Sequence, residues 1–180
     1  MWASMEDSHE VDIEEVAFHE AGHFVARYAL LPQEGFELVT VEPRLRADHG
    51  IVRKVLGACE ESVDPTEGPE GHRFWEPCAI GLYAGYAAQV KLRPSSEERA
   101  RRAAWLDFRM ARELTFKLFD QPPTPEMLAQ AGERLLNAAH ILVADAWPSV
   151  EALARALVAE LTLDGMRARQ IVAAVEPDTE

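Results

Sequence analysis

Residues 12–32 read DIEEVAFHEAGHFVARYALLP, and this stretch decides both the fold class and the candidate chemistry. Asp12, followed three positions later by Glu15, has the capping-box pattern that opens an α-helix. Pro32 disfavours helical geometry in the residue before it. The sequence therefore predicts a helix from Ile13 to Leu31.

Inside this helix, His19, Glu20 and His23 form an HExxH motif. Residues four apart share one helix face, so the two imidazoles can bind one ion, while the glutamate lies about 100° around the axis. A carboxylate beside a zinc ion can act as general base toward water. Glycine inside a helix costs about 1 kcal/mol relative to alanine, so Gly22 indicates close packing by another segment. The alternative is that both histidines are buried core residues.

A catalytic zinc ion generally has three protein ligands, so the motif requires one more from elsewhere in the chain. The helix expected over residues 95–119 carries Asp107 in its apolar stripe, where an unpaired carboxylate is costly. An ion pair or a solvated helix edge would also explain Asp107, and the candidate ion-pair partners are Arg53, Arg73 and Arg134. Glu113, on the more polar side of that helix, and His140, in an apolar stretch, are weaker rivals for the third ligand.

The rest of the chain predicts a mainly α fold with a small β-sheet, that is, an α+β domain. Two strands of this sheet are expected at Glu37–Glu42 and Ile51–Leu56. Residues 57–71 carry prolines, glycines and acidic side chains, which predict a surface loop and leave open whether residues 57–73 form a lid. Further helices are expected over 74–92, 95–119, 124–147 and 149–161, and residues 163–175 close the chain.

The composition predicts one domain, because 180 residues with 48% apolar side chains can build a sizeable core. We place this domain at residues 11–176, after an N-terminal tail or expression scar at residues 1–10. No stretch approaches 18 uncharged apolar residues, so we expect a cytoplasmic protein without a membrane span. A net charge of −13 repels nucleic acid and anionic lipid. Cys59 and Cys78 are expected to be free thiols.

Segments along nearly the whole chain resemble the peptidase domain of the FtsH-type ATP-dependent zinc proteases. The similar segments are FHEAGH at 18–23, residues 39–44 with 50–52, LYAGYAAQ at 82–89, residues 107–114 and LTLDG at 161–165. The resemblance implies a zincin-like fold that binds Zn²⁺ through His19, His23 and Asp107, with Glu20 as the general base. No other cofactor is implied.

By this resemblance the protein is a zinc-dependent endopeptidase that hydrolyses peptides or unfolded protein segments. The substrate would bind as an added strand at the sheet edge near Gly50–Arg53. The chain has Tyr86 and Gln89 where the family has arginine and glutamate, and it contains no P-loop motif, so we expect no intrinsic ATPase activity. A separate ATPase or adaptor and a homo-oligomer stay open. The alternative function is a non-catalytic regulatory or binding protein that retains the zinc peptidase fold.

Overall fold

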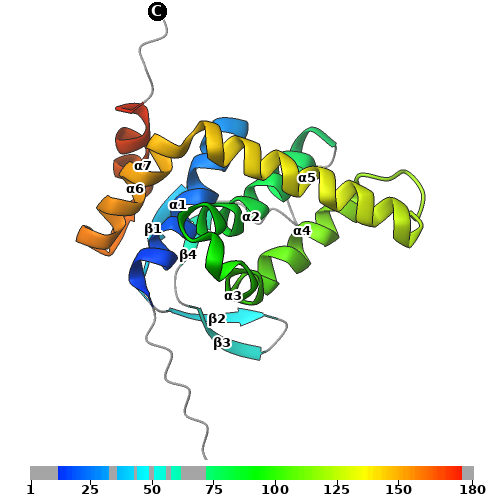
Figure 1. Ribbon diagram of the computed structural model, residues 1–180, viewed down its shortest axis with the longest axis horizontal. Coiled ribbons are helices and arrows are strands. Elements are labelled where there is room, and N and C mark those ends of the chain that lie inside the picture. Colours follow the sequence, from blue (N-terminus) through cyan, green and yellow to red (C-terminus); the bar gives the residue numbers. More distant parts are fainter. Residues whose placement is uncertain are drawn as a thin grey trace, which may run out of the picture.

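The computed structural model is mainly helical with two small sheets (Figure 1). It describes residues 12–32, 36–42, 44–48, 51–55, 58–61 and 72–175, and the side chains of residues 12–32, 37–42 and 74–175. The helices are α1 (Ile13–Leu30), α2 (His72–Leu92), the 3₁₀ turn η1 (Pro94–Ser96), α3 (Glu97–Ala103), α4 (Trp105–Lys117), α5 (Pro125–Asp145), α6 (Trp147–Glu160) and α7 (Gly165–Ala173). The strands are β1 (Phe36–Thr40), β2 (Arg44–Asp48), β3 (Ile51–Val55), β4 (Ala58–Glu61) and β5 (Thr162–Asp164). The expected class, mainly α with a small β part, is confirmed.

Helix α1 begins as its capping residue predicts. Asp12 Oδ1 accepts hydrogen bonds from the backbone N–H groups of Glu14 at 3.0 Å and Glu15 at 3.4 Å. The Glu15 carboxylate contacts the guanidinium groups of Arg93 and Arg99, which ties the start of α1 to the segment after α2. The helix ends one residue earlier than expected, with Leu31 as its C-cap.

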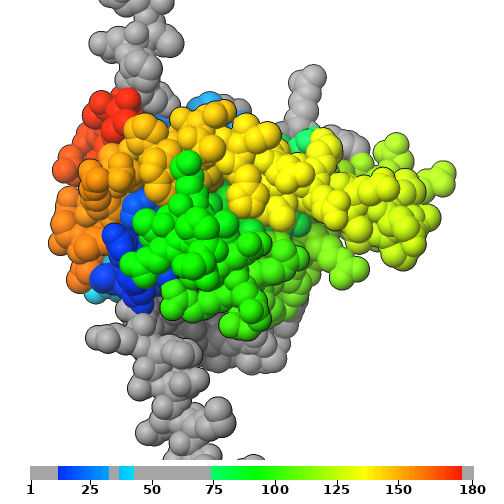
Figure 2. Space-filling model, in the orientation of Figure 1, coloured from blue at the N-terminus to red at the C-terminus, as the bar shows by residue number. Residues whose placement is uncertain are grey.

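Helix α1 is the centre of the fold and packs mainly against α2 and α6 (Figure 1). Gly22 allows the close approach of α2, as the sequence predicts. A Cβ atom at Gly22 would lie 2.5 Å from the backbone oxygen of Ala84 and 2.8 Å from Cβ of Ala88. In Figure 2 the side chains of α2 to α5 cover most of α1 on this face of the molecule.

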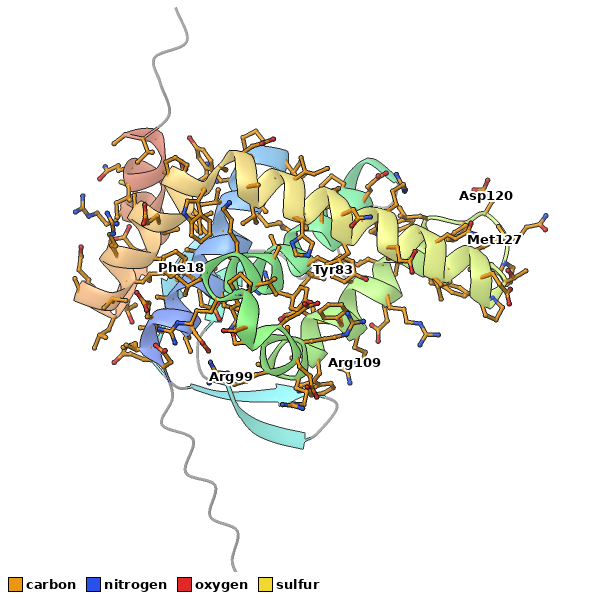
Figure 3. All side chains as sticks on the ribbon, in the orientation of Figure 1. Phe18, Tyr83, Arg99, Arg109, Asp120 and Met127 are labelled. Carbon is orange, nitrogen blue, oxygen red and sulfur yellow. The ribbon has the colours of Figure 1, made fainter. Side chains whose placement is uncertain are left out.

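The single helix expected over residues 95–119 is wrong, because the chain bends at Ala104 and forms α3 and α4. Ser96 is the N-cap of α3, but its side chain makes no capping hydrogen bond, because Ser96 Oγ donates to the backbone oxygen of Arg93 at 2.9 Å. The bend lets Phe108 pack edge-on against Tyr83 and Tyr86, with both ring-centroid distances 5.1 Å. Tyr83 lies where α2, α4 and α5 meet (Figure 3). The bend also places Asp107 in the first turn of α4.

The two expected strands do not belong to one sheet. Strand β1 is the middle strand of a three-stranded antiparallel sheet, between β4 and β5, whereas β3 pairs with β2. Strand β4 lies within the stretch 57–71, of which residues 58–61 are therefore strand rather than loop. Residues 62–71, and with them the question of a lid, lie outside the described residues.

Strand β5 has only three residues, too few for an alternating pattern to reveal it, and its pairing with β1 stabilises it. The side chain of Leu163 is buried in the main core, as is that of Val39 opposite it in β1. Thr40 Oγ1 and Thr162 Oγ1 lie 2.6 Å apart and share a hydrogen bond. These contacts join the C-terminal part of the chain to the strand that follows α1.

Helices α5 and α6 follow the predictions with small shifts, whereas α7 was not predicted as a helix. Thr124 caps α5 by accepting a hydrogen bond from the Met127 N–H at 3.3 Å. Helix α5 ends at Asp145, two residues early, and α6 begins at Trp147 because Pro148 is tolerated in its first turn. Over the residues that the structure describes, none of the helices is both long and apolar enough to cross a bilayer.

Some expectations fall outside what the structure describes. These are the tail at residues 1–10 and the side chains of Arg53, Arg73 and Cys59. Cys78 is a free cysteine, as expected, and its thiol is buried against the guanidinium of Arg27, whose Nη1 lies 2.8 Å from Sγ.

Candidate metal centre

Helices α1 and α4 bring the three predicted ligands together. His19 and His23 extend from successive turns of α1, and Asp107 comes from the first turn of α4. His19 Nε2 lies 2.9 Å from His23 Nε2 and 3.2 Å from Asp107 Oδ2, and the third distance, His23 Nε2 to Asp107 Oδ2, is 3.8 Å. In the part of the chain that the structure describes, these residues form the one group of three or more side chains arranged to hold a metal ion.

The spacing of these atoms fits a zinc ion. Zinc binds histidine nitrogen and carboxylate oxygen at about 2.0–2.2 Å, so two ligand atoms of a tetrahedral site lie about 3.3 Å apart. The three observed distances, 2.9, 3.2 and 3.8 Å, lie on both sides of that value. Shifts of a few tenths of an ångström would complete the geometry. Two imidazoles and one carboxylate are also a donor set that catalytic zinc uses.

Each imidazole is held by a hydrogen bond on its other nitrogen. His19 Nδ1 lies 2.9 Å from Oε1 of Gln89, and His23 Nδ1 lies 2.8 Å from the backbone oxygen of Gly81. Because both oxygens can only accept, each Nδ1 must donate, which directs the lone pair of each neutral ring to Nε2. Packing in an apolar core does not explain why the two Nε2 atoms face each other and also face a carboxylate.

The electrostatics of the cluster favour a cation. Burial lowers the pKa of His23, but the charges of Asp107 and Glu20 outweigh it and raise that pKa to about 9. Burial raises the pKa of Asp107, but the neighbouring His23 and His19 hold it well below its usual range. The carboxylate is therefore ionised at neutral pH. A metal ion would take the place of the proton that the free site holds.

Glu20 lies beside the ligand group without belonging to it. Its side chain is buried, with 6% of the residue surface exposed, and its charge contributes to the raised pKa of His23. It follows His19 directly on α1 and so points about 100° away around the helix axis. This is the placement that the HExxH spacing predicts for a general base.

The alternatives for Asp107 do not hold for the described residues. Arg134 Nη1 pairs with Glu76 Oε1 at 2.8 Å instead. The side chain of Glu113 is 56% exposed, and its Oε1 lies 3.9 Å from Nε of Arg109, which is four residues earlier on the same helix. His140 packs edge-on against Tyr86, with a centroid distance of 5.9 Å. Neither rival joins the ligand group.

Sequence reasoning missed the two groups that hold the imidazoles. Gln89 stood out only as a departure from the resembled family, although its amide accepts the His19 hydrogen bond as a carboxylate would. The Gly81 contact involves a backbone oxygen, which no side-chain pattern can reveal. A detectable signal was present in α2, where Gly81, Gly85 and Gln89 recur every four residues and share one helix face.

Comparison with protein-family models and with curated proteins finds no match for this chain.

Proposed function

We propose that this protein is a zinc-dependent endopeptidase that hydrolyses peptides or unfolded protein segments. One observation carries the proposal: His19, His23 and Asp107 converge on one point while both Nδ1 groups are engaged elsewhere. Together with the resemblance of the HEAGH segment, this geometry supports a zincin-like peptidase domain of the FtsH type. A cytoplasmic location and a separate ATPase or adaptor are part of the same proposal.

The roles of the residues follow from their positions. Zinc, when bound, would polarise the scissile carbonyl and make an attacking water more acidic. Glu20 takes the proton from that water and passes it to the leaving amine. Gln89 and Gly81 keep the two rings oriented, so that the site needs little rearrangement as the reaction proceeds. No covalent bond to the enzyme is required.

The alternative is a regulatory or binding protein with a structural zinc site. Structural zinc sites usually have four protein ligands, whereas the described residues supply three. A structural site also has no use for a buried carboxylate at its flank, which Glu20 provides. Both features favour the catalytic interpretation.

The experiment compares the native protein with Glu20→Gln, which keeps the size of the side chain and removes its basicity. Zinc content is measured by elemental analysis, and cleavage of unfolded casein by gel electrophoresis. We expect one zinc per chain in both forms and cleavage by the native form alone. Zinc in both forms without any cleavage would favour the regulatory alternative, and absence of zinc would refute both.

A further inference from the structure

Helix α2 passes directly beside the two imidazoles at Gly85. A Cβ atom at this position would lie 2.5 Å from Nε2 of His23 and 2.7 Å from its Cε1, and 2.9 Å from Cε1 of His19. Atoms of carbon and nitrogen that are not bonded settle at about 3.5–4.0 Å. A methyl group on Gly85 would therefore overlap both rings, and the first atom it meets is a proposed ligand atom.

The rings have little room to move away. His19 is held through Nδ1 by Gln89, and His23 through Nδ1 by the Gly81 oxygen. Their side chains are only 14% and 13% exposed. A displacement of about 1 Å, which the overlap demands, is large against a zinc–nitrogen bond of about 2.0–2.1 Å. Such a shift would break a hydrogen bond, separate the ligand atoms, or both.

We propose that Gly85 is a positioning residue of the metal centre, because its missing side chain allows the two imidazoles to converge on one ion. The inference rests on the proposed zinc site and adds a residue on the facing helix, α2, on which zinc binding depends. It also has a consequence for access. Since the α2 backbone occupies this side of the histidine pair, water and substrate must reach the ion from the other sides.

The other described glycines with a near neighbour differ from Gly85 in what they face. A Cβ at Gly22 would meet the α2 backbone, and one at Gly81 would meet the flexible side chain of Arg27 at 2.7 Å. Gly132 in α5 has only the Tyr83 hydroxyl nearby, at an ordinary contact distance of 3.6 Å. Gly132→Ala is therefore a matched control for Gly85→Ala, with the same chemical change in a helix interior away from the metal.

The test is zinc affinity, measured by competition with a chelating dye, for the native, Gly85→Ala and Gly132→Ala proteins. We expect Gly85→Ala to weaken zinc binding by about 100-fold or more, the upper end of the effect seen when groups that orient metal ligands are lost. Gly132→Ala should bind as the native protein does. If the native protein binds zinc and Gly85→Ala binds it within about threefold of native, the inference is wrong. If the native protein binds none, the proposed function itself fails.

A second measurement needs no metal and separates a steric conflict with the rings from a general packing defect. Gly85→Ala is introduced into a background in which both His19 and His23 are alanine, and thermal unfolding is recorded. Alanine is favoured over glycine in a helix, so with the rings removed the substitution should leave Tm unchanged or raise it. With the rings present and zinc removed, it should lower Tm. A lower Tm in both backgrounds would overturn the inference.

Discussion

Oε1 of Gln89 lies 2.9 Å from Nδ1 of His19, although the two residues are 70 positions apart in the chain. Gln89 is buried on α2, with 7% of its surface exposed, and its amide oxygen keeps the His19 ring in the tautomer that presents Nε2 to the proposed metal position. A group that hydrogen-bonds to a metal ligand can affect metal affinity nearly as much as the ligand itself.

Removing this acceptor should weaken metal binding. We expect Gln89→Leu to lower zinc affinity about 10- to 100-fold, because the His19 ring loses the hydrogen bond that orients it. Gln89→Glu keeps an acceptor and should bind zinc at least as tightly as the native protein. Competition with a chelating dye measures both. Equal affinity for the leucine and native proteins would show that the hydrogen bond does not orient the ligand.

Asp107 should be required for metal binding and Glu113 should not. Asp107→Asn removes the negative charge and leaves two imidazoles, so zinc affinity should fall by at least about 100-fold. Glu113→Gln, on the exposed side of the same helix, is the control and should keep native affinity. Isothermal titration with zinc checks both variants. Loss of binding in the Glu113 variant alone would reverse the assignment of the third ligand.

The β2–β3 hairpin makes a prediction about substrate binding. Asp48 and Ile51 face each other across a two-residue connection, so they should form a hydrogen-bonded pair. The next pair, Ala47 and Val52, is then of the other type, and the Val52 N–H points away from β2. A substrate added as a strand along β3 would need that N–H.

Val52→Pro should therefore weaken peptide turnover while zinc content stays native, because proline removes the donor on the edge of β3 that faces away from β2 and spares the bonds between β2 and β3. Val52→Ala, which keeps the N–H, is the control and should retain turnover. Hydrolysis of casein and zinc analysis are measured on both. Native turnover by the proline variant would exclude this edge as the substrate site.

His140 should make the fold less stable in mild acid. Burial against Tyr86 lowers the pKa of His140 below its usual value of 6.5, although the charge of Glu97 opposes this effect. As the pH falls through 6.5, the unfolded chain takes up a proton at this position before the folded chain does, so stability is lost toward lower pH. His140→Gln should flatten the dependence of Tm on pH between about 5 and 7. An unchanged slope would show that His140 titrates alike in both states.

The sequence by itself determined helix α1 and the positions of its motif residues. Asp12 caps the helix, and the spacing of His19, Glu20 and His23 follows from the helical repeat alone. The helices α2, α5 and α6 were also predicted to within a few residues, because prolines and caps mark their ends locally. Local patterns suffice where the physical cause is local.

Only the tertiary structure decided which distant groups meet α1. Asp107 reaches the histidines because the chain bends at Ala104. Gln89 and the Gly81 oxygen reach them because Gly22 lets α2 approach. Likewise, β5 forms because it pairs with the edge of β1 opposite β4. Strand β3 pairs with β2 rather than with β1. These long-range contacts depend on which surfaces are buried against each other. The sequence of a short segment does not specify the surface against which that segment will pack.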